Sequence, residues 1–257
     1  MIETNDATAG PELAVIVPTF NEVENVAELV SRIGRVLGDI RFEIIFVDDN
    51  SPDGTADAVR ELSLTDARVR CIQRVGRRGL STAVIEGMLA TSAPVAAVID
   101  GDLQHDETAL PKMFATLNSG GYDVVVASRY VEGGGMGDWS EERIQKSQTA
   151  TRIAKFMTKV ELGDPMSGFF MLRTQVLRDR AAGLSGVGYK VLLDILATSG
   201  ARLNVVEVPY EFRARQRGES KLDTKVALEY LELLLAKSIG RYVPVKFVMF
   251  SMVGGLG

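Results

Sequence analysis

The sequence predicts an α/β protein whose mostly parallel sheet is flanked by helices. Two observations carry this prediction. Apolar runs of strand length alternate along the chain with longer segments of helical periodicity. These runs are continuous stretches of valine, isoleucine and leucine, which is typical of strands buried on both faces in a parallel sheet. The 257 residues suffice for one large domain, or for one domain with an appended segment.

The elements follow in regular order over the first half of the chain. Strands are expected over residues 13–17, 42–47, 69–73, 95–99 and 123–127. Helices are expected between them, over residues 25–37, 55–62, 79–91 and 107–118. In open α/β sheets, ligands bind beyond the carboxyl ends of the strands. The polar turns after these strands are therefore expected to form one site.

The second half is less regular. A glycine-rich loop, VEGGGMGDWS, follows the fifth strand, and a helix is expected over residues 142–160. The segment DPMSGFF predicts a turn leading into a strand, and VVEVPYEF predicts a further strand before a basic loop. Residues 224–239 predict an amphipathic helix. The pattern fits a helix on a membrane interface and equally a helix packed on the sheet.

The last segment, residues 242–257, is apolar apart from Lys246. It is shorter than the roughly 20 apolar residues that span a bilayer. We interpret it as the first part of a transmembrane segment, with a terminal core helix as the alternative. The expected organisation is an α/β domain over residues 1–222, an amphipathic interface helix over 223–241 and the start of a truncated transmembrane domain over 242–257.

Composition excludes several classes of protein. A single cysteine, Cys71, excludes a disulfide framework and a multi-cysteine zinc site. A single histidine, His105, excludes a histidine-cluster metal site and limits acid–base chemistry. The net charge of −5 argues against a general nucleic-acid binder.

Asp100 and Asp102 directly follow the apolar run of the fourth strand, with Gly101 between them. Burying an unpaired carboxylate costs far more than burying a methyl group gains, so the pair either emerges into solvent or faces a cation. Mg2+ and Mn2+ prefer oxygen ligands, and Mg2+ typically takes one or two carboxylates together with substrate phosphates. Gln104 can add a carbonyl oxygen. We therefore expect a Mg2+ or Mn2+ site at Asp100, Asp102 and Gln104.

Asp48 and Asp49 form a second acidic pair after the second strand. A strand-end carboxylate can recognise a ribose hydroxyl or a base edge, which predicts that one of the two contacts a nucleotide. Turn formation and helix capping are the alternative, and they account for Ser51, Asp53 and Thr55. The sequence has no glycine-rich phosphate motif of the P-loop or dinucleotide type. A diphosphate would instead be held by a metal and basic side chains.

Those basic side chains are found near the end of the chain. The stretch RARQRGESKL contains Arg213, Arg215, Arg217 and Lys221, and guanidinium groups suit phosphate oxygens. A solvated charged loop is the alternative. His105 is expected to be a turn residue beside the metal loop rather than a catalytic base.

Together these segments resemble a known family. In chain order they are VIVPTFNEVENV, VDDNSPDGT, GLSTAVIEGM, DGDLQH, VVASRYVEGGG, DPMSGFFML, GYKVLLDIL and GESKL. The set is similar to family-2 glycosyltransferases with the GT-A fold, of the polyprenyl-phosphate (dolichyl-phosphate) mannosyltransferase type, over nearly the whole chain. The tail RYVPVKFVMFSMVGGLG is similar to the start of a GtrA-like membrane domain. Gly101 stands where alanine is common and GLST where GLGT is frequent, and these departures bear on the donor sugar.

The resemblance implies metal-dependent, inverting transfer of mannose from GDP-mannose to a polyprenyl phosphate. It places a cytosolic catalytic domain on the cytoplasmic face of a membrane. The implied partners are the nucleotide sugar, the lipid phosphate and the membrane, without nucleic acid. A lipid phosphate is already anionic, so no strong general base is needed, in keeping with one histidine. Alternatives are UDP-glucose or another sugar donor with the same lipid acceptor, a sugar-nucleotide pyrophosphorylase, and a membrane-tethered nucleotide-binding module without turnover.

The resemblance also implies the role of individual residues, which fall into donor, metal and acceptor groups. The donor group is Pro18, Glu22, Asp48, Asp49, Gly79, Asp100, Asp102, Gln104, Arg215 and Lys221. The metal group is Asp100, Asp102 and Gln104, and the acceptor-phosphate group is Arg129, Arg143 and Ser147. Arg215 and Lys221 match a mobile basic loop that closes over the diphosphates, and with Asp102 they are the expected catalytic residues.

Overall fold

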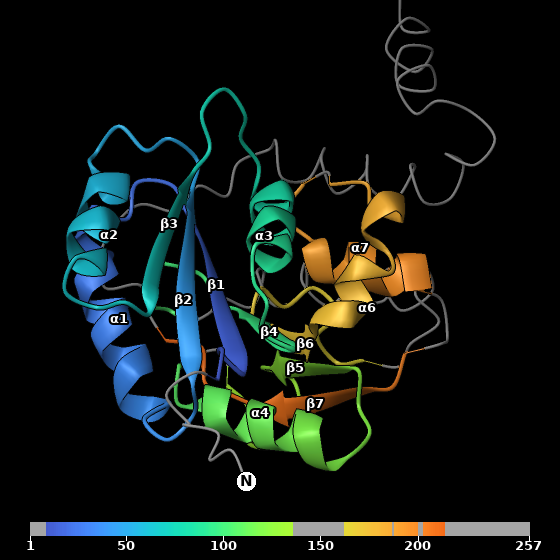
Figure 1. Ribbon diagram of the computed structural model, residues 1–257. Helices are drawn as coiled ribbons and strands as arrows, with labels where there is room; N and C mark the ends of the chain where they lie inside the picture. The colour runs from blue at the N-terminus through green and yellow to red at the C-terminus, as the bar shows by residue number, and fades with distance from the viewer. Residues whose placement is uncertain (1–8, 136–161, 187, 200–202, 214–257) are drawn as a thin grey trace, which may run out of the picture.

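The computed structural model describes residues 9–135, 162–186, 188–199 and 203–213. These residues form a seven-stranded sheet in the order β3-β2-β1-β4-β6-β5-β7, with helices on both faces (Figure 1). The strands are β1 (Leu13–Thr19), β2 (Phe42–Asp48), β3 (Val69–Gln73), β4 (Val95–Val98), β5 (Val124–Ser128), β6 (Phe170–Arg173) and β7 (Val205–Pro209). The helices are α1 (Val23–Val36), α2 (Thr55–Ser63), α3 (Leu80–Leu89), α4 (Ala109–Ser119), α6 (Thr174–Arg178) and α7 (Val191–Ser199), with a short 3-10 turn, η2 (Ala181–Gly183). The predicted α/β architecture is confirmed.

The elements expected in the first half are all present, and their ends differ from the prediction by at most two residues. The turn and strand expected at DPMSGFF correspond to the approach to β6, and the later strand corresponds to β7. Helices α6 and α7 were not predicted. Their segments are only five and nine residues long, so helical periodicity has little length over which to show itself.

Strand β6 is the exception to the parallel pattern. It pairs antiparallel with β4 and with β5, whereas the other neighbouring strands pair in parallel. Because its direction is reversed, the residues that precede β6 lie at the sheet edge where the parallel strands end. The segment over residues 164–168 thus arrives at the edge expected to carry the site.

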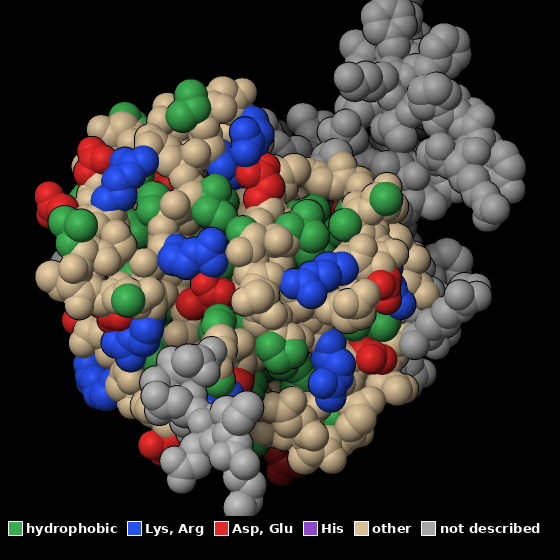
Figure 2. Space-filling model, in the orientation of Figure 1, with side chains coloured by type: hydrophobic (Ala, Val, Ile, Leu, Met, Phe, Trp, Pro, Cys, Tyr) green, Lys and Arg blue, Asp and Glu red, His purple; other side chains and the backbone are tan. Residues whose placement is uncertain are grey.

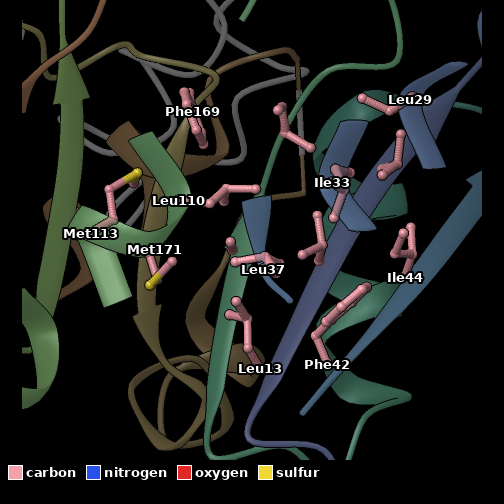
Figure 3. Close-up of a cluster of buried hydrophobic side chains, with 14 of the residues drawn as sticks. Leu13, Leu29, Ile33, Leu37, Phe42, Ile44, Leu110, Met113, Phe169 and Met171 are labelled. Atoms are coloured by element: carbon pink, nitrogen blue, oxygen red, sulfur yellow. The ribbon is translucent and has the colours of Figure 1, made fainter. Parts of the chain in front are cut away.

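The continuous apolar runs fill two cores, one on each face of the sheet. In β1, Leu13, Val15 and Val17 belong to one core, whereas Ala14 and Ile16 belong to the other, as the two-residue period of a strand requires. The first core packs the sheet against α1, α2 and α4, and the second packs it against α3, α6 and α7. Figure 3 shows part of the first core, where side chains of α1 and α4 meet those of the strands. Each large apolar side chain buried in this way contributes about 1.5–3 kcal/mol.

Helix α1 illustrates how the sequence fixes which face is buried. Val26, Leu29, Val30 and Ile33 recur at helical spacing and are all buried against the sheet. On the side away from the core, the Arg32 Nε donates to Glu28 Oε1 at 2.7 Å, four residues earlier. The helix therefore has an apolar stripe toward the sheet and a paired polar side toward solvent.

Basic and acidic side chains are interspersed over the face of the molecule in Figure 2, among the residues that are described there. None of the helices in the described ranges combines the length and the apolar character needed to cross a membrane. The helix expected over residues 142–160, the interface helix and the apolar tail lie outside those ranges. The domain boundaries at 222 and 241, and the likeness of the tail to a GtrA-like domain, therefore stay predictions.

Candidate active site

Polar residues from several strands meet at one edge of the sheet. The turn after β4 and the segment before β6 approach each other closely: a Cβ on Gly168 would lie 3.0 Å from Asp100 Oδ2. The turn after β2 is joined to the end of β1 by a hydrogen bond from Asp49 N to Thr19 O at 3.0 Å. The segment before β6 is likewise joined to the end of β5, since Ala127 N donates to Phe169 O at 3.0 Å. The described site residues are thus gathered from distant parts of the chain.

The proposed metal ligands lie in the turn after β4, over residues 100–104, which we call the metal turn. Asp102 Oδ1 accepts a hydrogen bond from Gln104 N at 3.1 Å, and Leu103 between them takes a positive φ of 62°. The Asp100 side chain is 35% exposed, so it is accessible from solvent. Among the described residues, no three His, Cys, Asp or Glu side chains are close enough together to hold a metal. Two carboxylates and one amide oxygen nevertheless fit a hard cation that takes its remaining ligands from water and phosphate.

Gly101 allows the metal turn to pass close to the end of β1. A Cβ at this position would lie 3.1 Å from Thr19 Cγ2 and 3.5 Å from Glu22 Cγ. An alanine would therefore require Thr19 to move by a few tenths of an ångström. The departure from the family pattern at Gly101 thus goes with a close approach of this turn to Thr19.

His105 lies beside the turn after β4 and is buried, with only 4% of its surface exposed. Its Nε2 is 3.1 Å from Asp100 Oδ2, and its Nδ1 is 3.1 Å from the Tyr210 hydroxyl. Burial raises the pKa of Tyr210, so this phenol stays protonated. No sequence pattern connects Tyr210 with the turn after β4.

The two neighbouring aspartates at the end of β2 are used differently. Asp48 is fully buried, and its Oδ2 accepts from Ser51 N at 2.8 Å while its Oδ1 accepts from Thr19 Oγ1 at 3.3 Å. Asp49 instead accepts from Gly79 N at 2.7 Å, and its Oδ1 lies 3.4 Å from Arg74 Nη1. Asp48 therefore closes its own turn, whereas Asp49 joins that turn to the start of α3.

The prediction of turn chemistry for Ser51, Asp53 and Thr55 is confirmed, but the expected helix cap is not, because the N-cap of α2 is Gly54. Asp53 Oδ1 accepts from Thr55 N at 3.0 Å, and its Oδ2 accepts from Val23 N at 3.1 Å. Burial would raise the pKa of Asp53, but the hydrogen bonds from Thr55 and Val23 outweigh it and lower the pKa below its ordinary value. The turn is thereby fixed to the start of α1.

Arg74 is a site-edge residue that the sequence did not single out. It is 1% exposed and reaches across the loop before α3, where Nη1 donates to Gly79 O at 3.1 Å and Nη2 donates to Thr82 Oγ1 at 2.7 Å. Its charge also faces Asp49. A single arginine at a strand end carries no sequence signal that separates it from a surface arginine.

Arg129 and Asp164 form a bidentate ion pair between the end of β5 and the segment before β6. Arg129 Nε and Nη2 donate to the two Asp164 oxygens at 2.8 and 3.1 Å. Burial would lower the pKa of Arg129, but the attraction of Asp164 outweighs it and raises the pKa. Glu207 holds the same segment by accepting from Gly163 N at 2.7 Å and from Asp164 N at 2.9 Å. Asp164 belongs to the motif DPMSGFF, which the sequence marked without giving this residue a role.

A lysine stands near this pair. Lys190 Nζ donates to Met166 O at 3.5 Å. Burial, followed by the repulsion of Arg129, lowers the pKa of Lys190. The positive charges of this region thus belong to a partly buried cluster around Asp164.

Arg213, one of the arginines expected to serve the diphosphates, has two carboxylate partners. Its Nη2 donates to Asp106 Oδ1 and its Nη1 to Glu107 Oε2, each at 2.7 Å, and its backbone N donates to Gln104 O at 2.8 Å. Arg213, the last described residue, is therefore hydrogen-bonded to the metal turn and to the two acidic residues that follow it. The remaining residues of the basic and acceptor groups, Arg143, Ser147, Arg215, Arg217 and Lys221, lie outside the described residues.

The other two expected donor residues lie at the end of β1. Pro18 is buried within the strand and stands beside Val47 in the register of β1 and β2. Glu22 precedes α1, where its Oε2 accepts from Asn25 Nδ2 at 2.8 Å and its backbone N donates to Thr55 Oγ1 at 3.0 Å. Both therefore border the turns that carry Asp49 and Asp102.

The largely parallel sheet with one reversed strand, which carries an Asp-Gly-Asp turn at the edge where the parallel strands end, matches the fold of GT-A glycosyltransferases. The chain belongs to glycosyl transferase family 2, whose model matches residues 14–180. It is therefore an enzyme that transfers a sugar.

Relatives of known activity cover most of the chain. It is 40% identical over 247 residues to a dolichol-phosphate mannosyltransferase of Pyrococcus furiosus, covering 95% of this chain and 68% of that protein. It is 34% identical over 248 residues to a dolichol-phosphate mannosyltransferase of Saccharomyces cerevisiae, covering 93% of this chain and 91% of that protein. It is also 32% identical over 214 residues to a polyprenol monophosphomannose synthase of Mycolicibacterium smegmatis, covering 81% of this chain and 80% of that protein.

A solved structure has the same fold. The glucosyl-3-phosphoglycerate synthase of Mycobacterium tuberculosis, crystallised with Mn2+, UDP and glucosyl-3-phosphoglycerate, superposes with a TM-score of 0.66 at 20% identity, covering 90% of this chain and 81% of that chain. The expected GT-A fold is confirmed.

Proposed function

We propose that this glycosyltransferase transfers mannose from GDP-mannose to the phosphate of a polyprenyl phosphate, at the cytoplasmic face of a membrane. One observation carries the proposal. The relatives named dolichol-phosphate mannosyltransferase are 34% and 40% identical to this chain over more than nine-tenths of its length. The site at the strand ends supplies side chains suited to each step.

The donor nucleotide would be bound at the turns after β1 and β2. Asp49 is the carboxylate we assign to the nucleoside, because Asp48 is fully buried and engaged within its turn. Gly79 and Arg74 hold the Asp49 carboxylate in place through contacts of 2.7 and 3.4 Å. Pro18 and Glu22 border the same turns.

Asp100, Asp102 and Gln104 would hold a Mg2+ or Mn2+ ion together with the donor diphosphate. When bound, the ion neutralises the charge that develops on the departing nucleoside diphosphate. The residues fit it because the open Asp100 carboxylate and the turn around Asp102 offer only hard oxygen donors.

The acceptor would be recognised as an anion. Arg129 lies at the end of β5 and, with Arg143 and Ser147, is assigned to the lipid phosphate. An oxygen of that phosphate forms a bond to the anomeric carbon of mannose while the bond from that carbon to the donor's β-phosphate oxygen breaks. Attack from the opposite side inverts the anomeric carbon and gives β-mannosyl phosphate and GDP. Since the phosphate oxygen carries no proton, the chain needs no general base.

Arg215 and Lys221 are assigned to closing over the donor diphosphate and the acceptor phosphate. Their charges would hold two anions at reacting distance, and the rate would come chiefly from positioning and electrostatic stabilisation. Asp102, Arg215 and Lys221 are accordingly the residues we propose as catalytic.

The proposal is tested by measuring transfer of labelled sugar from GDP-mannose and from UDP-glucose, separately, to a short polyprenyl phosphate with and without Mn2+. Transfer from GDP-mannose that requires the ion supports the proposal. Transfer from UDP-glucose alone would support sugar transfer to the lipid phosphate but contradict GDP-mannose as the donor. Binding of nucleotide without transfer from either donor would contradict the proposed activity.

A further inference from the structure

Two consecutive hydrogen bonds connect the residue after β7 with the metal turn through the buried His105 side chain. Tyr210, directly after β7, contacts His105 Nδ1 through its hydroxyl at 3.1 Å, and His105 Nε2 contacts Asp100 Oδ2 at 3.1 Å. Tyr210 and His105 are each 4% exposed, whereas Asp100 is 35% exposed. The hydrogen-bonded series thus ends on Asp100, the member that is accessible from solvent.

The geometry allows one continuous donor–acceptor arrangement in which the Asp100 carboxylate accepts. In that arrangement the His105 ring donates from Nε2 to Asp100 Oδ2. A neutral ring that carries its proton on Nε2 has an accepting Nδ1, to which the Tyr210 hydroxyl can donate.

The surroundings hold the imidazole ring in one orientation. The rings of Phe169 and Phe212 lie with their centroids 5.4 Å from that of His105, and Tyr210 lies at 5.6 Å. The backbones of His105 and Phe212 also form an isolated antiparallel bridge. At Gly168 a Cβ would lie 3.5 Å from His105 Nε2 and 3.0 Å from Asp100 Oδ2, so glycine keeps this contact open. Packing on several sides leaves the ring little freedom to turn.

We propose that His105 is a positioning residue that orients Asp100 for a divalent cation, and that Tyr210 sets the tautomer in which His105 does so. The inference rests on the proposed metal site. Asp100 Oδ2 is engaged by the ring, and we assign Oδ1 to the cation. Residues that hydrogen-bond a metal-binding side chain commonly govern metal affinity, and their loss costs about 10- to 100-fold.

Metal binding is the direct test. Free Mn2+ is titrated by electron paramagnetic resonance against the full chain in the presence of GDP, so that the diphosphate can complete the coordination. His105→Phe keeps an aromatic ring in the packed site and removes the donor, and it should weaken Mn2+ binding by about tenfold or more. His105→Gln places an amide N–H near the position of Nε2, and it should restore binding to within about threefold of the original chain.

Tyr210→Phe removes only the hydroxyl that sets the tautomer. Because the chain has one histidine, the nitrogen NMR spectrum of protein labelled at histidine reports on His105 alone. The unchanged protein should show a protonated Nε2 and an unprotonated Nδ1, and Tyr210→Phe should shift the Nδ1 signal and weaken Mn2+ binding less than His105→Phe does. A ring protonated on Nδ1 alone would overturn the proposed arrangement.

The controls separate this inference from the metal site itself. Folding of each variant is checked by circular dichroism and thermal unfolding. If His105→Phe does not fold, the Mn2+ affinities of Tyr210→Phe and His105→Gln test the positioning role instead. If the original chain with GDP binds no Mn2+, the proposed metal site is wrong. If the original chain binds Mn2+, Asp102→Asn does not, and folded His105→Phe binds as tightly as the original chain, the metal site stands and the positioning role of His105 is wrong.

Discussion

Asp48 and Asp49 show how two identical neighbouring residues acquire different tasks. Asp48 points into the protein and accepts hydrogen bonds from Ser51 and Thr19, so its carboxylate maintains the turn. Asp49 faces Gly79 and Arg74 at the start of α3. The direction of each side chain depends on where the strand ends, because successive residues of a strand point to opposite faces.

Exchanging each aspartate for asparagine should separate these tasks. Asp48→Asn replaces an acceptor by an amide that cannot satisfy the same donors, and it should lower the free energy of unfolding by about 1–3 kcal/mol. Asp49→Asn should instead weaken GDP binding about tenfold, which corresponds to roughly 1.4 kcal/mol. Urea unfolding and calorimetric titration with GDP measure the two effects. Equal effects of both variants on GDP binding would remove the distinction between the two carboxylates.

Asp102→Asn tests the metal assignment at the level of one side chain. Loss of a ligand charge should reduce the rate of sugar transfer by about 100-fold, or roughly 2.7 kcal/mol in the barrier, without unfolding the chain. Initial rates are compared over a range of Mn2+ concentrations. Asp57→Asn is the matched control, since the Asp57 side chain is 79% exposed on α2, and it should leave the rate unchanged. Undiminished transfer by a folded Asp102→Asn would contradict the assignment.

At this scale the sequence could propose only residues whose signal is local. Asp100, Asp102 and Gln104 were proposed because acidic and amide side chains follow a buried strand within a few positions, and their metal-binding role stays a prediction. Tyr210 could not be linked to His105, because 105 residues separate them and only the packing of β7 beside β5 brings them together. Asp164 and Arg129, 35 residues apart, were missed as a pair for the same reason.

At the scale of elements, the periodic segments were predicted well and the direction of β6 was not. An apolar run buried on both faces has the same pattern whether its strand runs parallel or antiparallel. The reversal of β6 brings residues 164–168 to the edge of the sheet where the parallel strands end, and only the assembled sheet shows this. Arg129 and Gly168 could then be placed in the same site as Asp100.

Helix α3 packs on the sheet through a glycine, and this contact makes a prediction about stability. A Cβ at Gly87 would lie 2.5 Å from Ile16 Cγ2 and 2.9 Å from Val47 Cγ2, so Gly87→Ala should lower the free energy of unfolding by about 1–3 kcal/mol. Gly34→Ala in α1 is the control, because its Cβ would meet no atom closer than 3.6 Å. Helix propensity should make this variant up to about 1 kcal/mol more stable. Urea unfolding of both compares them, and a stabilised Gly87→Ala would show that α3 can move away from β1 and β2.

At the scale of the whole molecule, the parts of the site form one edge of a single sheet. The turns that we propose for the donor follow β1 and β2, the turn that we propose for the metal follows β4, and Arg129 follows β5. The proposed transfer between two anionic partners fits such an arrangement, since it would bring both to the same edge of the sheet. Sequence pattern predicted this edge because strand ends are local features, whereas the helices and loop expected around the acceptor lie in residues outside the described ranges.

The central claim is that the acceptor is a phosphate and the donor is GDP-mannose. The most direct measurement incubates the full chain with labelled GDP-mannose, Mn2+ and either a short polyprenyl phosphate or the matching polyprenol, with folded Asp102→Asn as the blank. We expect mannose to be transferred to the polyprenyl phosphate, and neither the polyprenol nor the blank to accumulate labelled lipid. Equal transfer to the polyprenol, or transfer to the phosphate that is unaffected by Asp102→Asn, would contradict it.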